Sequence, residues 1–353
     1  MMLQNDFSDC YKISGGLDGN AQKTRIEHNG DVYIIKFGSV LKRDNTESKI
    51  GSYNHLPIAE HVGCKVARAL GLPVQETLLG SYEGREVVAC KDFILPLGSE
   101  FHLQSYNSFE IELVPPAKRG KAPRLSNINH VFDTHRFFDG IRDVVKERYW
   151  DTMVFDAIIA NIDRHGGNWG YIAKRTTSPG GHLTNKFFDL APIYDCGSSL
   201  AAWLDEKAMT EIASDAESMK SRALGHPAAC LVVSGDRQRV FYHDLLMSDA
   251  GSPARASLMK LAPAIRSLNI DAVLDAVPEI SDVRRDFYKA TLYSRIKHIL
   301  QPAYELACQE RGLQPGSVLP HVPTLVTVKS PWDGKEEDSG RNNCRSYAPS
   351  FRP

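Results

Sequence analysis

Two short stretches of the chain carry residues suited to phosphoryl-transfer chemistry. In IANIDRHGGNW (159–169), Asp163 stands five residues ahead of Asn168, and in APIYDCGSS (191–199), Asp195 opens an Asp-x-Gly triplet. An acid can orient a hydroxyl and take its proton, while an amide and a second acid can hold magnesium. The spacing D-x-x-x-x-N followed by D-x-G is typical of the catalytic and metal loops of kinases. The sequence therefore predicts an ATP-dependent kinase.

Asp163 is the predicted catalytic residue, placed at the mouth of a cleft where it orients the acceptor hydroxyl. The alternative is an aspartate that caps a helix after Asn161, but the spacing to Asn168 and Asp195 favours the catalytic interpretation. His165, also predicted to be catalytic, can orient Asp163 or contact the transferred phosphate. A structural hydrogen bond from His165 to its own loop is an equally good interpretation.

Asn168 and Asp195 are the predicted magnesium ligands, because magnesium prefers oxygen donors and keeps positions open for water and phosphate. The alternative, a turn asparagine and an aspartate at a strand end, is less favoured. Gly166 and Gly167 supply the backbone bend that a metal loop requires. Cys196 replaces the large apolar residue of an Asp-Phe-Gly triplet, and we expect its thiol to be buried and inert.

Lys36 closes the apolar run VYIIKF (32–37), where a charge must point into a cleft and find a partner. Its predicted partners are the phosphates of the nucleotide and a carboxylate from the following helix. Glu60, early in that helix, is the first choice, and Glu47 in a polar loop is the weaker one. A solvated lysine–glutamate pair is the alternative interpretation.

A glycine-bearing loop precedes the first long strand, and its backbone amides can surround phosphate. It matches neither G-x-x-x-x-G-K-[ST] nor G-x-G-x-x-G, so on its own it is a weak signal. The segment VVACKDF (87–93) is the predicted hinge, with backbone available to adenine. Together with Lys36 and Glu60, the predicted nucleotide-binding residues are Ser14, Gly15, Gly16, Gln22, Lys23, Cys90 and Asp92.

The elements that must position these residues divide the chain into two lobes and a tail. We expect residues 1–95 to form a β-rich N-lobe. Its predicted elements are a hairpin over 22–38 around Asn29–Gly30, a helix over 56–74 and strands at 76–82 and 85–94. Residues 96–320 predict a mostly helical C-lobe. We expect two helices within 135–161, a hairpin over 169–195 and helices over 282–312. Residues 321–353 predict a flexible polar tail. The predicted fold class is α+β, bilobal and protein-kinase-like.

The composition is that of an ordinary globular protein, with 42% hydrophobic and 24% charged residues among 353. A net charge of −1 argues against nucleic acid or an anionic membrane as a direct partner. No apolar run is long enough for a membrane span, and no signal peptide is recognisable. Seven cysteines without C-x-x-C pairs fit neither a disulfide framework nor a zinc site. We expect a cytoplasmic protein, although export without a signal would leave no mark.

These motifs resemble the HipA-like serine/threonine kinases of bacteria, distant relatives of the phosphoinositide kinases. NIDRHGGNWG, APIYDCGSS and YIIKF resemble the family's catalytic, metal and nucleotide-lysine blocks, and SGGLDGNAQKT resembles its phosphate loop. AEHVGCKVARALGLPV resembles its glutamate helix, with Glu60 at the glutamate. The resemblance covers residues 12–310. It implies that Asp163 is the catalytic base, that Asn168 and Asp195 bind magnesium and that Lys36 binds ATP.

The resemblance also implies autophosphorylation at the loop serine, to which Ser14 corresponds, and a protein substrate with a serine or threonine acceptor. The toxin members of the family carry a further part ahead of this loop. This chain begins near the loop and is more similar to the short, stand-alone kinases, which weakens the expectation of an antitoxin partner. Two alternatives remain open: a lipid kinase, suggested by the order Asp-Arg-His, and a nucleotide-binding pseudokinase or interaction module.

Overall fold

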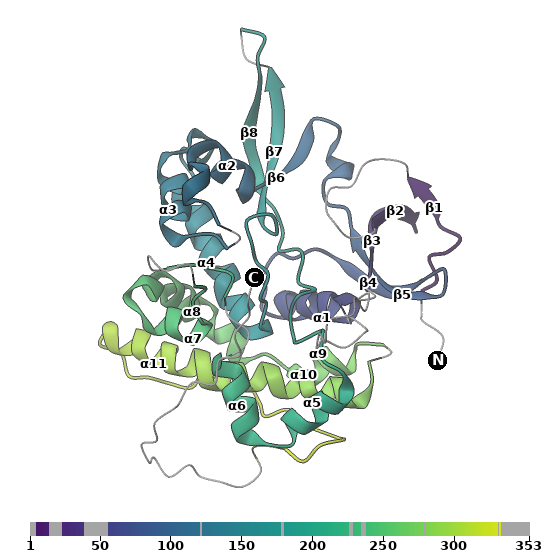
Figure 1. Cartoon of the computed structure of the whole chain (residues 1–353), viewed down its shortest axis with the longest axis vertical. Helices are drawn as coiled ribbons and strands as arrows, with labels where there is room; N and C mark the ends of the chain where they lie inside the picture. Colours follow the sequence, from purple (N-terminus) through teal and green to yellow (C-terminus); the bar gives the residue numbers. More distant parts are fainter. Residues whose placement is uncertain are drawn as a thin grey trace.

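The computed structural model describes residues 5–13, 23–38, 56–120, 122–177, 180–225, 229–233, 238–278, 280–330 and 332. They form a smaller β-rich lobe and a larger, mostly helical lobe, as Figure 1 shows. The predicted α+β bilobal fold is therefore confirmed.

The N-lobe is built on a five-stranded antiparallel sheet in the order β1-β2-β3-β5-β4. Helix α1 (Leu56–Ala69) packs against β4 and β5. The predicted hairpin is confirmed, because Asn29 and Gly30 both adopt left-handed backbone angles, as a tight two-residue turn requires. The strands are β1 (Tyr11–Ile13), β2 (Lys23–His28), β3 (Asp31–Phe37), β4 (Thr77–Tyr82) and β5 (Arg85–Lys91).

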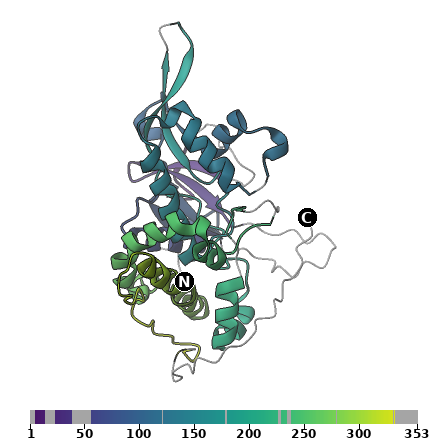
Figure 2. The same cartoon turned by 90° about the vertical axis from the view of Figure 1, so that its left-hand side faces the viewer.

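A second sheet of three strands joins the lobes, and its outer hairpin projects from the molecule in both views (Figures 1 and 2). It consists of β6 (Phe101–Ser105), β7 (Gly170–Thr177) and β8 (Leu183–Leu190). The β7–β8 hairpin agrees with the prediction for 169–195, whereas β6 was not predicted. Strand β6 pairs with β7 about seventy residues later in the chain, and short-range periodicity carries no signal for such a partner.

Ten helices in the described residues follow the N-lobe and form most of the C-lobe. They are α2 (Tyr106–Leu113), α3 (Leu125–Thr134), α4 (Arg142–Ile159), α5 (Glu206–Ala213), α6 (Ala216–Gly225), α7 (Tyr242–Met247), α8 (Ser252–Arg266), α9 (Ile270–Asp275), α10 (Asp282–Arg295) and α11 (Gln301–Glu310). A π-helical turn, Ile296–Leu300, joins the last two. Within 135–161 there is one long helix, α4, after a short 3₁₀ turn, instead of the two helices predicted. Gly140, whose φ is +80°, separates the turn from α4.

Helix α4 runs through the centre of the C-lobe and leads directly into the catalytic stretch. Twelve of its residues are buried, including every one from Tyr149 to Ile159. The helix ends at Ala160, which adopts a left-handed conformation with φ of +58°. This reversal turns the chain out of the core, so that Asp163 emerges toward the second sheet and the N-lobe.

The described part of the predicted polar tail lies against α10. Val326 and Thr327 donate backbone hydrogen bonds of 2.7 and 2.6 Å to the buried carboxylate of Asp286. The ring of Trp332 contacts that of Tyr293, with centroids 4.7 Å apart. The other residues beyond 330 lie outside the described residues. Among the helices that the structure describes, none is both long enough and apolar enough to cross a membrane.

Candidate active site

The site is a cleft of about 840 Å³ that contains groups from both lobes. Its N-lobe wall is the face of the sheet formed by alternate residues of β2, β3 and β5, and its C-lobe wall is formed by the stretches 163–168 and 194–198. Nine residues predicted from the sequence line this cleft: Lys23, Lys36, Glu60, Cys90, Asp92, Asp163, His165, Asn168 and Asp195. Ser14, Gly15, Gly16, Gln22 and Glu47 lie outside the described residues.

Lys36 connects the two lobes inside the cleft. Its Nζ lies 3.3 Å from Glu60 Oε1 in α1 and 3.3 Å from Asp195 Oδ1 in the C-lobe. Burial disfavours the charged ammonium, but the two carboxylates outweigh it and raise the pKa of Lys36 well above its usual range. Glu60, the first choice from the sequence, is therefore a partner of Lys36, and the pair is largely buried rather than solvated.

Lys23 and Lys36 occupy directly opposite positions in the β2–β3 ladder, so their side chains leave the same face of the sheet. Two like charges at such a position repel each other. Arg25 follows on the same face and forms an ion pair of 2.9 Å with Asp92. Arg25 was not among the predicted residues, although its period-two spacing from Lys23 was a usable signal. The N-lobe wall thus presents three cations to the cleft.

Asp92 and Cys90 contribute to the N-lobe side of the cleft in different ways. The Asp92 carboxylate, only 3% exposed, accepts from Arg25 and from the backbone amides of Ile94 and Leu95. Its own amide donates to Val32 O at 2.7 Å. Cys90 is fully buried in the sheet. Asp92 therefore shapes the turn that leads from the N-lobe into residues 93–94, which also line the cleft.

The catalytic stretch is held by hydrogen bonds among its own residues. Asn161 Oδ1 accepts from the amide of Asp163, and Asn168 Nδ2 donates to Asp163 O at 2.8 Å. His165 Nδ1 accepts from the amide of Gly167, and its Nε2 lies 4.0 Å from Asp163 Oδ2. The Asp163 carboxylate itself remains half exposed to the cleft. His165 thus forms a hydrogen bond within its own loop, one of the two interpretations that the sequence allowed, and its ring also faces Asp163.

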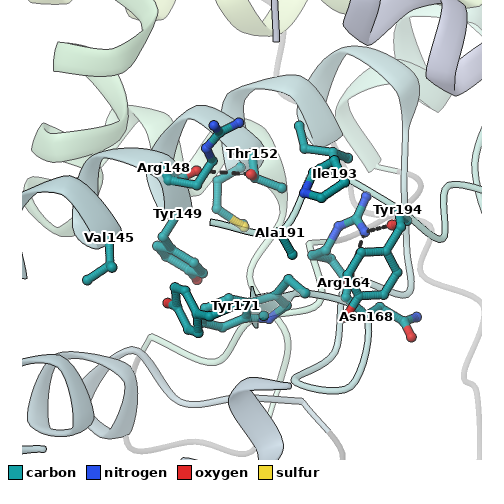
Figure 3. Close-up of a pocket in the computed structure, with 14 residues that line it drawn as sticks. Val145, Arg148, Tyr149, Thr152, Arg164, Asn168, Tyr171, Ala191, Ile193 and Tyr194 are labelled. Atoms are coloured by element: carbon teal, nitrogen blue, oxygen red, sulfur yellow. Dashed lines mark hydrogen bonds between the residues drawn. The ribbon is translucent and has the colours of Figure 1, made fainter. Parts of the chain in front are cut away.

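Arg164 fastens the catalytic stretch to the segment that carries Asp195. Its guanidinium pairs with the fully buried Asp156 of α4 and donates to the carbonyl oxygens of Asn168 and Tyr194, as Figure 3 shows for Tyr194. A small cavity of about 30 Å³ lies behind Arg164, between α4 and residues 191–194. That volume is too small for a nucleotide, whereas the larger cleft has room for one. No sequence spacing identified Asp156 as the partner of Arg164.

The segment before Asp195 is tied to the N-lobe by backbone pairing. Gln75 N donates to Ile193 O, and Ile193 N donates to Pro73 O, both at 2.9 Å. Asp195 itself has a left-handed backbone with φ of +58°. The segment after Asp195 also lies close to α1, because a Cβ at Gly63 of that helix would lie 2.8 Å from the Cβ of Cys196. Only glycine allows α1 to approach this closely. Cys196 is buried, as the sequence predicted.

The two candidate acids differ in their electrostatic surroundings. Burial raises the pKa of Asp163, an effect that His165 opposes and Asp195 reinforces. The ammonium of Lys36 lowers the pKa of Asp195, with burial acting against it and Arg164 and Lys23 in support. A carboxylate with a raised pKa suits proton transfer, and one with a lowered pKa stays ionised as a metal ligand.

The cleft offers few side-chain donors for a metal ion. Among the described residues, no group of three or more His, Cys, Asp or Glu side chains could hold a metal. Asn168 commits its amide nitrogen to Asp163 O, which leaves its side-chain oxygen as a possible ligand beside the partly exposed Asp195 carboxylate. Two oxygen donors fit magnesium, which retains waters and shares phosphate oxygens.

Comparisons with known proteins agree with this geometry. The HipA-like C-terminal domain family matches residues 15–241. The serine/threonine-protein kinase CtkA of Helicobacter pylori is 29% identical over 308 residues, which cover 86% of this chain and 89% of that protein. The crystal structure of a proinflammatory kinase CtkA from H. pylori superposes with a TM-score of 0.74 at 28% identity, covering 88% of this chain and 99% of the other.

Proposed function

Because this chain belongs to the HipA-like C-terminal domain family and is a HipA-like serine/threonine-protein kinase, we propose that it transfers the γ-phosphoryl group of magnesium-bound ATP to a serine or threonine hydroxyl in the cleft between its lobes. The observation that carries this assignment is the convergence of Lys36, Asp163, Asn168 and Asp195 on one cleft. They come from three separate parts of the chain and supply the parts of a phosphoryl-transfer site.

Asp163 is proposed as the catalytic base. Its carboxylate is half exposed and faces the cleft, where it can orient the acceptor hydroxyl and accept its proton. The hydrogen bond from Asn168 to Asp163 O and the loop bond of His165 hold the backbone in place. His165 is proposed to orient the acid or to contact the transferred phosphate.

The phosphates of ATP are proposed to lie along the N-lobe wall, near Lys36 and Lys23. The opposed lysines of β2 and β3 repel each other, and phosphate oxygens between them would convert that repulsion into two favourable contacts. Glu60 keeps Lys36 oriented. Adenine is proposed to contact the backbone after Cys90, near Asp92. Ser14, Gly15, Gly16 and Gln22 are proposed to complete the phosphate loop.

Asn168 and Asp195 are the residues that would hold magnesium. When bound, the ion neutralises phosphate charge during transfer. The lowered pKa of Asp195 keeps its carboxylate ionised, and Arg164 holds the Asn168 and Tyr194 backbone carbonyls together, so the two ligands share one rigid support.

The decisive experiment measures label transfer from γ-labelled ATP by the wild type and by two isosteric variants. Asp163→Asn should lower the rate by about 10²–10⁴-fold while ATP binding stays near wild type, because a general base is lost. Asp195→Asn should weaken magnesium-dependent ATP binding as well as transfer. Thr184→Val on the distant β8 strand serves as a matched control and should retain full activity. Unchanged transfer by both active-site variants would overturn the assignment.

The same assay identifies the acceptor when it is run under three conditions. The chain is assayed alone, with a mixture of serine- and threonine-containing proteins, and with phosphoinositide vesicles. We propose a protein acceptor, with autophosphorylation at Ser14 as one event. Mass spectrometry of the labelled chain locates the modified residue. Label on the vesicles alone would favour the lipid-kinase alternative, and ATP binding without any transfer would favour a pseudokinase.

A further inference from the structure

An exposed arginine borders the catalytic stretch just outside the cleft. Arg239 Nη1 donates a hydrogen bond of 2.5 Å to Ile162 O, one residue before Asp163, while the arginine itself remains exposed. Arg239 is not among the residues that line the cleft. Burial raises the pKa of Asp163, and the charge of Arg239 opposes that rise, as His165 does more strongly. A cation therefore lies close to the candidate catalytic acid, outside the space assigned to the nucleotide.

The backbone around Arg239 belongs to a small ribbon of three paired segments. The central segment, 229–233, forms two backbone hydrogen bonds of 2.9 Å with Val240, the residue after Arg239. On its other side, Val232 forms an isolated parallel bridge with Arg124. The segments that carry Arg239 and Arg124 therefore lie two strand spacings apart, about 10 Å. This pairing brings a second arginine to the region beside the catalytic stretch.

Arg124 is the last residue of a strongly basic stretch of the sequence. Residues 116–124 read PAKRGKAPR and contain four cations and no acid, in a chain whose net charge is only −1. Of the described cations in this stretch, Lys118 is exposed, and Arg119 and Arg124 are partly exposed. A local concentration of positive charge attracts an anionic partner and speeds its association. The charge is thus concentrated near the part of the C-lobe that carries Asp163.

We propose that Arg239, together with Arg124, recognises an acidic side chain of the protein substrate close in sequence to the acceptor serine or threonine. This inference rests on the proposed function and names the class of its substrate. An acceptor that reaches Asp163 leaves its neighbouring residues at the mouth of the cleft, because the nucleotide occupies the interior. Those residues then meet the surface that carries Arg239. A guanidinium binds a carboxylate through two parallel hydrogen bonds, which suits recognition of aspartate or glutamate.

Arg239 also has a structural contact, its hydrogen bond to Ile162 O, and the two roles predict different kinetics. If Arg239 only supported the backbone next to Asp163, its removal would lower kcat by the same factor for every peptide. If it binds an acidic side chain of the substrate, its removal raises KM for acidic peptides and removes their advantage over neutral ones. The KM of ATP distinguishes neither role, because Arg239 lies outside the cleft lining.

The test compares phosphate transfer from γ-labelled ATP to serine peptides that carry either Asp and Glu or Asn and Gln around the acceptor. The wild type should favour the acidic peptide by about fivefold in kcat/KM, as one exposed ion pair allows, and less so at high salt. Arg239→Gln should remove this preference, and Arg239→Glu should reverse it toward peptides with lysine at the same positions. Arg311→Gln is the matched control and should retain the preference, because Arg311 is likewise exposed and donates to a backbone carbonyl, Ala307 O.

A second measurement uses the wild type alone and serves if the Arg239 variants fail to fold. An acidic peptide with a photoreactive group beside its acidic residue should become attached to residues 122–124 or 238–242, as located by mass spectrometry. Attachment elsewhere, or equal kcat/KM for acidic and neutral peptides, would overturn this inference and leave the kinase assignment intact. Absence of transfer to every peptide and protein would instead overturn the proposed function, and this inference with it.

Discussion

Arg164 and Asp156 form a two-pronged ion pair, with Nε–Oδ2 and Nη2–Oδ1 distances of 2.9 Å each. Both side chains are buried, and the same guanidinium donates to the carbonyl oxygens of Asn168 and Tyr194. One charge pair rooted in α4 therefore holds the catalytic stretch against the segment that carries Asp195. Arg164 acts through these neighbours, so it is a positioning residue.

Removing the anion of this pair should be strongly destabilising. Asp156→Asn leaves the Arg164 charge buried without its counter-ion, and we expect the free energy of unfolding to fall by about 3–5 kcal/mol. Urea denaturation followed by fluorescence measures the change. Asp163→Asn, which alters a half-exposed carboxylate seven residues away, is the control and should cost no stability. Equal losses in the two variants would show that the ion pair is not the anchor.

Lys36 and Glu60 should be energetically coupled in nucleotide binding. Lys36→Met removes the cation proposed to contact phosphate, and Glu60→Gln removes the carboxylate 3.3 Å from Lys36 that holds it. Calorimetric ATP affinities of the two single variants and the double variant form a cycle, with an expected coupling of about 0.5–3 kcal/mol. Strict additivity would mean that Glu60 does not orient Lys36. Glu76→Gln, an exposed carboxylate that pairs with Lys91, is the matched control.

The two acids of the cleft should affect stability with opposite signs as the pH changes. Lys36 lowers the folded-state pKa of Asp195, so its stabilising contribution is present above its unfolded pKa, near 4, and is lost as the pH falls through the folded value. Burial raises the folded-state pKa of Asp163, so its ionised form reduces stability at higher pH.

Urea unfolding of Asp195→Asn and Asp163→Asn between pH 3 and pH 7, without magnesium, tests this difference. Relative to the wild type, Asp195→Asn should lose stability as the pH rises, and Asp163→Asn should gain it. At the acidic end both variants should approach the wild type, because the protonated acids then resemble the amides. A shift of the same sign in both variants would contradict the electrostatic assignment.

The segment 321–332, which follows α11, should contribute to stability. Asp286 accepts hydrogen bonds from Val326 N, Thr327 N and Thr327 Oγ1. A chain that ends at residue 320 loses these bonds, each worth about 1.5–3 kcal/mol when the acceptor is charged. A chain that ends at residue 332 keeps them and should be more stable than the chain that ends at residue 320. Equal stability of the two truncated chains would refute a structural role for 321–332.

The chemistry of the site was predictable from the sequence because its signals are local. The five-residue step from Asp163 to Asn168 and the Asp-x-Gly triplet at Asp195 each lie on one short loop. Lys36 was predictable because a lysine at the end of an apolar strand needs an anionic partner. The Asn29–Gly30 hairpin was predictable because few residues tolerate two successive left-handed positions.

The tertiary structure alone decided which distant groups meet. Lys36 and Asp195 are 159 residues apart in sequence, and only the docking of the lobes places their charged atoms 3.3 Å apart. The ion pairs of Arg164 with Asp156 and of Arg25 with Asp92 also form only in the packed chain. A charge in a sequence shows that a partner is needed, but its identity depends on burial, and burial is a property of the packed chain.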